Sequence, residues 1–547
     1  MESGYSEAKR KLLQKCLRGE MELHPRAKIP RLPPGELAPI SHAQEQIWMH
    51  AQLAPELPLY NEPFTIQHSG PLDVVALERS FNEILRRHEA WRTTFKVVEG
   101  HALQQVHDRL VISLPVTDLR SLTPNRREAA AIAIATAETS VPLDLSELPL
   151  FRVRLIRLDD EDYRLYLTLS HIIFDGVAIY GVFLPELVAL YKDFSAGKPS
   201  SLPELPFQYS DYASWERRTF TPEALLKNVQ YWREQLNGPF PEIYLPTDRP
   251  IARSKTFLGS RYPFKLNRSL TASLRHYCRN NGLSLFHALL AGFAALLYRY
   301  SGEERIPIGG VTVGRNLPGT ELLLGYFMNT VIFPADLSGN PNFRILASRA
   351  RDWTIDALDH DRIPIEHLLR ELRVQPDPGR YAGLQALFSL EAPMPEIDPA
   401  WGITQMDVDT GATKYDLYLE LDERSDEVLA RFHYNTDLFE RSTIERMLGH
   451  FQQLMESAVE SPDARIAELS IMSAEERRQV VGEWNQTGED YPRVLTIQEA
   501  FEQQVERTPQ ASALIHAGKR WSYEQLNGDA NRLGGWLIQQ GIGQDCR

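Results

Sequence analysis

Cysteine is scarce in this chain of 547 residues, which contains three, Cys16, Cys278 and Cys546. They lie far apart in the sequence and form no CxxC pair, which argues against a disulfide framework and against a cysteine-built zinc site. Basic residues do not dominate either, because the formal net charge is −14. A general nucleic-acid-binding role would need a dominant basic surface, so we do not expect that role. We also expect no metal centre.

Long apolar runs are also missing. No run of about 18 apolar residues is present to span a bilayer, and the first five residues lack the apolar core of a signal peptide. With 43% hydrophobic and 24% charged residues, the composition is that of a globular, cytoplasmic protein. The chain is too long for one ordinary core, so we expect at least two lobes and a further fragment.

Strand-like and helix-like segments alternate between about residues 40 and 215. Apolar residues have helical spacing over 74–87, whereas 151–155 and 163–169 alternate between apolar and polar as strands do. Residues 182–191 have helical spacing again, but Pro185 lies inside this pattern. We therefore expect that helix to begin late or to bend at the proline.

The second half of the chain repeats this alternation. Residues 284–300 form a strongly apolar pattern typical of a buried helix, and 306–313 are typical of a buried strand. Residues 443–459 are amphipathic with helical spacing. After residue 461 the sequence becomes polar and charged, as linkers do.

The segment Ser170–Gly176 reads Ser-His-Ile-Ile-Phe-Asp-Gly and follows the strand-like residues 163–169. Strand alternation places His171 at the end of an apolar row, where its imidazole, with an ordinary pKa of about 6.5, can exchange protons at cellular pH. Gly176 can adopt a positive φ and bring its N–H close to a substrate, and at the start of a helix that N–H could stabilise an oxyanion. A hydrogen-bonded core histidine is the alternative interpretation of His171.

Six short motifs occur in order along the chain, and together they resemble those of nonribosomal peptide synthetase condensation domains. They are Ser41–Trp48 (Ser-x-Ala-Gln-x-x-x-Trp), Arg87–Phe95 (Arg-His-Glu-x-Trp-Arg-Thr-x-Phe), Ser170–Gly176 (Ser-His-x-x-x-Asp-Gly), Tyr209–Trp215 (Tyr-x-Asp-Tyr-Ala-x-Trp), Gly325–Thr330 (Gly-x-Phe-x-Asn-Thr) and His360–Glu366 (His-x-x-x-Pro-x-Glu). The resemblance covers residues 41 to about 370 and continues more loosely to about 480.

The resemblance implies an α/β fold made of two chloramphenicol-acetyltransferase-like lobes, set in a V as a pseudo-dimer with a central tunnel. On this basis we divide the chain as follows: residues 1–38 form an N-terminal helix and linker, 39–215 the first lobe, 216–465 the second lobe, 466–495 a linker and 496–547 a truncated adenylation-domain fragment.

The resemblance further implies an amide-forming acyltransferase of secondary metabolite biosynthesis. A donor acyl-thioester and an acceptor aminoacyl-thioester arrive on phosphopantetheine arms of two carrier proteins, and the chain itself binds no cofactor. His171 either acts as a general base or positions the attacking amine, with Gly176 as the second catalytic residue. Asp175 supports the site by pairing with an arginine, for which Arg315 is the candidate; the alternative for Arg315 is a solvated loop residue.

One departure from the family pattern is clear: the first histidine of the motif is Ser170 here. Adjacent residues of a strand point to opposite faces, so Ser170 is expected to support the turn and to form no nucleophilic pair with His171. A heterocyclisation domain is excluded because such domains carry aspartates where the motif has histidine. Two different functions stay open beside amide formation: a non-catalytic docking module that recruits carriers or enzymes, and a free-standing transferase that uses coenzyme A.

The C-terminal residues 496–536 resemble the beginning of an adenylation domain, which speaks against an epimerisation domain. Residues 514–516 and 520–521 are expected to pair as a hairpin, and Ser522 with Gln525 to form a capping box. The fragment contains no phosphate-binding loop, so it cannot adenylate by itself. The rest of the synthetase module, including an adenylation domain, is therefore an expected partner.

Residues 5–19 have the pattern of a short helix with a narrow apolar stripe among basic residues. Such a helix either receives an acidic tail of an upstream synthetase or polyketide subunit, or packs on its own domain. We expect no partner among nucleic acids or membranes.

Overall fold

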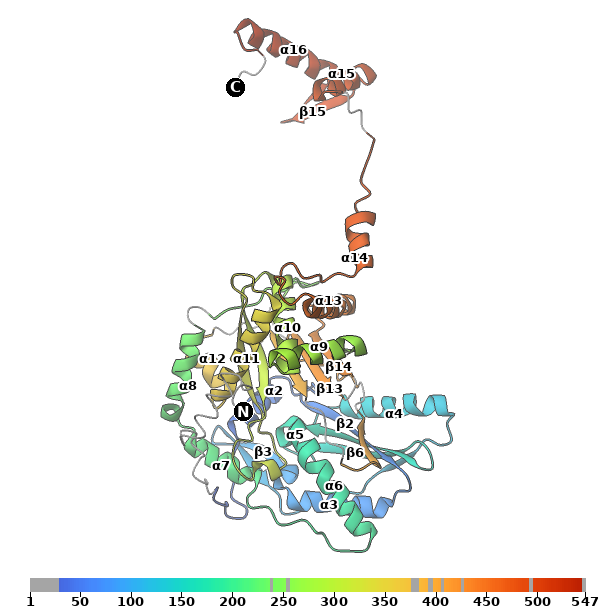
Figure 1. Cartoon of the computed structure of the whole chain (residues 1–547), viewed down its shortest axis with the longest axis vertical. Coiled ribbons are helices and arrows are strands. Elements are labelled where there is room, and N and C mark those ends of the chain that lie inside the picture. The colour runs from blue at the N-terminus through green and yellow to red at the C-terminus, as the bar shows by residue number, and fades with distance from the viewer. Residues whose placement is uncertain are drawn as a thin grey trace. The chain divides into compact units, whose positions relative to one another are not determined.

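The computed structural model describes residues 29–236, 240–251, 256–374, 383–391, 397–404, 408–424, 427–490 and 495–543. The chain divides into two compact units, residues 1–473 and 474–547, and each is described by itself (Figure 1). The helix expected over residues 5–19 lies outside the described residues, as do Cys16 and Cys546.

The described residues of the first unit form two large hydrophobic cores and one small cluster, and the part of the chain around each large core is called a lobe. The sheet of the first lobe has the strand order β12-β2-β7-β6-β5. Its strands are β2 (Asn61–Ser69), β5 (Val116–Asp118), β6 (Phe151–Arg157), β7 (Asp162–Ser170) and β12 (Trp401–Thr404). A separate small sheet contains β1 (Ala38–Pro39), β3 (Thr93–Val98) and β4 (His101–Val106). The strands predicted over 151–155 and 163–169 are confirmed as β6 and β7.

Helices cover both faces of the first sheet. They are α2 (His42–Leu53), α3 (Val74–Arg87), α4 (Pro124–Thr139), α6 (Leu184–Ser195) and α7 (Tyr209–Thr219). Helix α3 begins where the Asp73 side chain accepts hydrogen bonds from two backbone N–H groups, and it packs against α6. Its bounds are those predicted from the apolar spacing, because Leu77, Phe81 and Leu85 are buried together on one side.

The region around Pro185 departs from a regular helix. The short helix α5 (Gly176–Ala178) continues into a π-helical turn, η3 (Ile179–Phe183), and α6 begins only at Leu184. Pro185 is one of the first two residues of α6. Because proline has no N–H to continue the preceding turn, the regular helix starts at this point, as the sequence predicts.

The second lobe is built on a larger sheet with the strand order β10-β9-β11-β13-β14-β8. Its strands are β8 (Gly259–Leu266), β9 (Arg305–Thr312), β10 (Asn329–Asp336), β11 (Ala386–Glu391), β13 (Leu417–Glu423) and β14 (Val428–Asn435). Its helices are α8 (Pro222–Gln235), α9 (Arg268–Asn281), α10 (Leu285–Ser301), α11 (Phe343–Asp359), α12 (Ile365–Glu371) and α13 (Arg441–Glu460). The predicted elements over 284–300, 306–313 and 443–459 are confirmed as α10, β9 and α13.

Helix α10 lies at the centre of the second core and contacts α9, α11 and α13. It is apolar on nearly every side because protein surrounds it, with Leu289, Leu290 and Phe293 fully buried. Ser284 caps its beginning, and Gly302 ends it in the left-handed conformation, at a φ of 77°. Among the described residues, no single helix meets the length and hydropathy of a bilayer span; α9 and α10 do so only as a pair bent by 109°.

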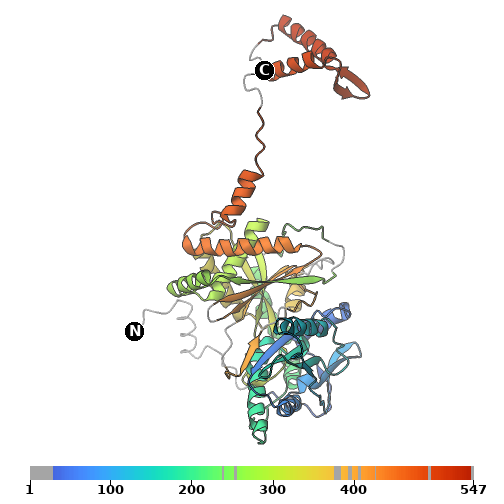
Figure 2. The ribbon, with the colours of Figure 1, turned by 90° about the vertical axis from the view of Figure 1, so that its right-hand side faces the viewer.

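The two lobes exchange segments. Strand β12 comes from the second half of the sequence but pairs with β2 at the edge of the first sheet, as Figure 2 shows for the short orange strand beside the blue one. Tyr326 and Phe327, which follow the 3-10 turn η4 (Thr320–Leu322), are buried in the first core. Helix α7 continues past residue 215, and Leu469 is buried in the second core. The lobe boundaries given from sequence stay predictions.

The second unit contains α14 (Ala474–Arg478), the π-helical turn η5 (Gln479–Glu483), α15 (Ile497–Arg507), β15 (Ser512–His516), β16 (Lys519–Ser522) and α16 (Tyr523–Gln539). Strands β15 and β16 pair antiparallel, which confirms the predicted hairpin, with Ala517 and Gly518 at positive φ in the turn. The capping box of Ser522 and Gln525 is also present. The assignment of this unit to an adenylation domain stays a prediction.

Candidate active site

His171 lies one residue beyond the end of strand β7. Ser170 is the last residue of the strand, and it is buried, with its N–H bonded to the Leu150 carbonyl oxygen. His171 opens the 3-10 turn η2 (His171–Ile173), and its N–H donates to the carbonyl oxygen of Tyr60 at 2.9 Å. The prediction that His171 ends the strand is therefore wrong by one residue, because the chain turns there.

The His171 ring is fixed by its neighbours. Its Nδ1 lies 2.9 Å from the carbonyl oxygen of Phe174, which can only accept, so Nδ1 carries the proton and Nε2 keeps its lone pair. The ring stacks on Phe174 at 4.9 Å and meets the edge of Tyr326 at 5.0 Å. The side chain is half-buried. This arrangement leaves Nε2 as the atom that can accept a hydrogen bond from a substrate.

Burial lowers the pKa of His171 below its ordinary value of 6.5. Lys414 lowers this pKa further, whereas Glu62, the hydrogen bond to Phe174 and Asp175 raise it. The net lowering keeps the imidazole neutral at neutral pH, which is the form that can accept a proton or a hydrogen bond.

Asp175 and Arg315 form a buried ion pair. Arg315 Nη2 lies 3.0 Å from both carboxylate oxygens, and the two side chains are 5% and 0% exposed, so Arg315 is not a solvated loop residue. Asp175 also accepts the N–H groups of Ala178 at 2.8 Å and of Phe327 at 3.0 Å. Each carboxylate oxygen of Asp175 thus accepts hydrogen bonds from Arg315 and from one backbone N–H. These bonds fix the turn that carries His171.

Arg315 is held from several sides as well. Its guanidinium donates to the carbonyl oxygens of Thr320 and Leu323, and its central carbon lies 4.3 Å above the Phe327 ring. Because Arg315 and Phe327 flank strands β9 and β10, this pair ties the second lobe to the helix that starts after Asp175.

Gly176 begins helix α5, which Asp175 caps. Its φ is not positive, so the left-handed conformation open to glycine is not used, and the N–H lies at the start of a helix, as the sequence also suggested. A Cβ at this position would lie 3.8 Å from Glu391 Oε1 and 3.9 Å from a ring carbon of Tyr180. The backbone of Gly176 therefore approaches both residues across a space that no side chain fills.

Four hydrogen bonds connect five of the six motifs around this turn. The Gln44 amide donates to the Ile172 carbonyl oxygen at 2.9 Å, and the Ser41 hydroxyl lies 2.8 Å from that of Tyr209. Tyr209 in turn donates to the carbonyl oxygen of Tyr326, and Asn329 donates to the Ile363 carbonyl oxygen at 2.8 Å. Motifs that are weak separately thus form one connected structure.

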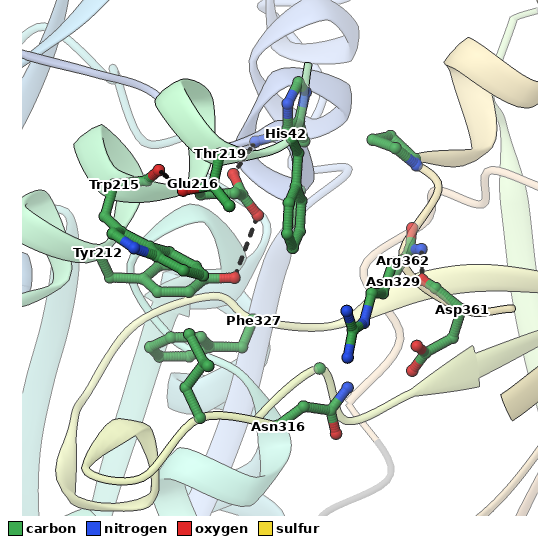
Figure 3. Close-up of a pocket in the computed structure, with 15 residues that line it drawn as sticks. His42, Tyr212, Trp215, Glu216, Thr219, Asn316, Phe327, Asn329, Asp361 and Arg362 are labelled. Atoms are coloured by element: carbon green, nitrogen blue, oxygen red, sulfur yellow. Dashed lines mark hydrogen bonds between the residues drawn. The ribbon is translucent and has the colours of Figure 1, made fainter. Parts of the chain in front are cut away.

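A cavity of about 180 Å³ lies beside this structure, between the two lobes (Figure 3). It is lined by residues of four motifs, including His42, Trp215, Phe327 and Asp361. Glu216 is buried in its wall and accepts the N–H of His42 at 2.8 Å and the Tyr212 hydroxyl at 3.1 Å. Burial raises the pKa of Glu216, and burial together with Arg217 lowers that of His42 to about 4.

Comparison with known proteins supports the assignment that the motifs suggest. The family model of the condensation domain matches residues 36–481. The chain belongs to the condensation-domain family. Over 519 residues it is 37% identical to the chondramide synthase of Chondromyces crocatus, and the match covers 94% of this chain and 13% of that protein. The chain thus spans little more than one tenth of the length of this relative.

Solved structures share the same fold. A four-domain nonribosomal peptide synthetase bound to AMP and glycine is similar with a TM-score of 0.75 and 19% identity, over 95% of this chain and 40% of that one. The X-domain in complex with OxyB from teicoplanin biosynthesis is similar with a TM-score of 0.70 and 24% identity, over 82% of this chain and 99% of that one. The predicted chloramphenicol-acetyltransferase-like architecture is confirmed.

Several residues near His171 were not found from the sequence of this condensation domain. Tyr60, Glu62 and Lys414 come from segments outside the quoted motifs, and the Lys414 ammonium lies 4.1 Å above the Tyr60 ring. Burial lowers the pKa of Lys414 to about 8, although Glu62 opposes this. No local pattern marks these residues, because only contacts between distant parts of the chain, such as that of Lys414 with Tyr60, bring them to the site.

The lowered pKa of His171 can be measured directly. In a titration of the free condensation domain followed by NMR, we expect a midpoint for the His171 ring below pH 6.5, because the enclosed site disfavours the imidazolium. The signal is assigned by its absence from the His171→Gln variant. A midpoint at or above 6.5 would contradict the neutral imidazole on which the site depends.

Proposed function

We propose that this condensation domain joins a donor acyl-thioester to the amine of an acceptor aminoacyl-thioester, each carried on the phosphopantetheine arm of a carrier protein. The observation that carries the proposal is the presentation of His171 Nε2 on a rigid turn, with Nδ1 already engaged by Phe174. A histidine that only filled the core would not need a half-buried ring whose second nitrogen stays available to accept a hydrogen bond.

The proposed reaction is the transfer of the donor acyl group from sulfur to nitrogen. The acceptor nitrogen forms a bond to the donor carbonyl carbon, the carbon–sulfur bond breaks, and the donor arm leaves as a thiol with the proton that the amine gives up. His171 Nε2 accepts a hydrogen bond from the attacking amine, either taking its proton or orienting it. Because thioesters are reactive, holding two arms in attack geometry supplies much of the acceleration.

The remaining site residues have distinct parts in this proposal. The N–H of Gly176, at the start of its helix, is placed to stabilise the negative charge that develops on the donor carbonyl oxygen. Asp175 and Arg315 keep the turn in place, and Ser170 supports it from the end of β7. The aromatic cavity beside Trp215 and Phe327 suits a flexible arm with amide groups.

The test of this function uses the whole chain with separately loaded donor and acceptor carriers and follows the mass of the acceptor carrier. The proposal predicts an amide product only when both carriers are loaded. A second set of reactions offers the same acyl group on coenzyme A. Product from coenzyme A but not from the donor carrier would indicate a free-standing transferase, and product from neither, across a panel of substrates, would favour a non-catalytic docking module.

We further propose that the basic segment 5–19 binds an acidic tail on an upstream subunit, which brings the donor carrier to this chain. With the donor carrier supplied in trans on its native subunit, deleting residues 1–25 is expected to give about a tenfold higher KM for that subunit, the effect of losing a few exposed charge pairs. Turnover with an isolated donor carrier is the control and should be unaffected. An unchanged KM for the native subunit would contradict this docking role.

A further inference from the structure

One face of the second sheet carries a row of polar side chains. On β13, Leu417, Leu419 and Leu421 are buried in the second core, so the alternate residues Tyr418, Glu420 and Asp422 lie on the opposite face. The neighbouring strands add further polar residues at the paired positions of this face, namely Ser389 and Glu391 on β11 and Arg431 and His433 on β14. We call this set the polar face.

Most members of the polar face pair with each other. Glu420 accepts hydrogen bonds from His433 Nε2 at 2.6 Å and from Arg431 Nη1 at 3.3 Å. The hydroxyl groups of Ser389 and Tyr418 lie 2.7 Å apart. In the part of the chain that the structure describes, Glu391 has no hydrogen-bond or ion-pair partner. A carboxyl group at the end of β11 is thus left available.

Glu391 lies beside the turn of the active site. Its Oε1 is 3.8 Å from where a Cβ on Gly176 would be, and Tyr180 borders the same point. The Tyr180 ring contacts Phe64 at 6.1 Å, Phe64 contacts Phe174 at 5.3 Å, and Phe174 supports the His171 ring. Because Gly176 has no side chain, nothing separates its backbone from the Glu391 carboxyl group.

The surroundings of Glu391 are electrically negative. Burial, followed by the nearby Glu420 and Asp422 carboxylates, raises the pKa of Glu391 to about 8, although Arg431 opposes this. Burial, followed by the carboxylates of Glu391, Asp422 and Glu420, also raises the pKa of the Tyr180 hydroxyl. At neutral pH, Glu391 therefore holds a proton while the site is empty, and a positive charge brought beside it would favour the ionised form.

We propose that Glu391 is a specificity-determining residue that binds a positively charged amine on one of the two thioester substrates, beside Gly176. This inference rests on the proposed function. The amine belongs either to the side chain of the donor or to that of the acceptor, and both sources present the same ammonium group to the carboxylate. Binding the ammonium group ionises Glu391 and releases its proton.

This proton release gives the selectivity a pH dependence. Below pH 8 the Glu391 carboxyl group must lose a proton before it can pair with the amine, so preference for a basic substrate weakens as the pH falls. A lysine side chain stays charged throughout this range. The ratio of kcat/KM for a lysyl substrate to that for a norleucyl substrate should therefore rise between pH 6 and pH 8. Protonation of the attacking amine affects both values of kcat/KM alike, so it does not change the ratio.

The experiment measures this ratio with the whole chain and loaded carriers. In one arm the donor carries lysyl or norleucyl and the acceptor is held constant; in the other arm the two roles are exchanged. Wild type is expected to favour lysyl by about tenfold or more in one arm, the worth of one charge-assisted hydrogen bond. Glu391→Gln should reduce this preference to about threefold or less, and Glu391→Asp, which keeps a carboxyl group, should retain part of it.

The matched control is Glu427→Gln, which removes a carboxylate that pairs with exposed Lys265 at the turn between β13 and β14. This variant should keep the wild-type ratio. Equal ratios in wild type and Glu391→Gln, or a wild-type ratio that does not change between pH 6 and pH 8, would overturn the inference. The pH result stands even if Glu391→Gln fails to fold. If wild type forms no amide from any pair, the proposed function itself fails.

Discussion

Replacing His171 by alanine is expected to slow amide formation by about 100-fold or more, the usual contribution of a positioned acid or base. The loss follows because the variant has no acceptor for the attacking amine, while the thioester and the rest of the site are unchanged. The measurement is kcat for the amide product with both carriers at saturating concentration. His101→Ala is the control, because His101 is exposed on β4 and should keep the wild-type rate.

His171→Gln separates the two roles that are open for this residue. Glutamine can accept a hydrogen bond from the amine but cannot take its proton. Recovery of most of the rate in this variant would indicate positioning, and a rate as low as that of His171→Ala would indicate a general base. A rate for His171→Ala within about twofold of wild type would contradict both roles.

Replacing Arg315 by alanine should lower the free energy of unfolding of the condensation domain by about 3–5 kcal/mol. The substitution leaves the fully buried Asp175 carboxylate without its cation and removes the contact with Phe327. Chemical denaturation followed by tryptophan fluorescence measures the change. Amide formation should fall as well, because Asp175 holds the turn that carries His171 and Gly176.

The exposed pair of Arg344 and Asp463 provides a matched comparison, with a distance of 2.9 Å but side chains that are 46% and 72% exposed. Arg344→Ala should cost no more than about 1 kcal/mol, since water screens such pairs. In a double-mutant cycle, Asp175→Asn combined with Arg315→Ala should cost less than the two single changes added together. Additive losses, or a loss at Arg315 as small as that at Arg344, would show that the buried pair does not support the turn.

The local elements were accessible from the sequence because their causes are local. Helix α3 has the predicted bounds, since an aspartate cap and a regular apolar row decide where it lies. The capping box of α16 and the hairpin before it were likewise visible in short patterns. The pairing of Asp175 with Arg315 came from the family resemblance and not from any local pattern.

Other features depend on contacts that no local pattern records. His171 leaves the strand one residue earlier than alternation suggests, because its N–H bonds to Tyr60 and its ring to Phe174. Gly176 does not have a positive φ, and a Cβ there would lie in ordinary contact, 3.8 Å, with Glu391 Oε1 from the other lobe. Strand β12 pairs with β2, a strand more than 300 residues earlier in the sequence: Gly402 lies opposite Gln67. These outcomes are decided by the long-range packing of the two lobes.

The central claim is that the turn bearing His171 is the centre of amide formation, and a single-turnover experiment tests it most directly. Wild type and His171→Ala are mixed separately with one pair of loaded carriers, and the amide on the acceptor carrier is followed over time by intact-protein mass spectrometry. The account predicts an amide from wild type that forms at least about 100 times faster than from the variant. Equal rates from both proteins, or no amide from either protein across a panel of loaded carriers, would contradict it.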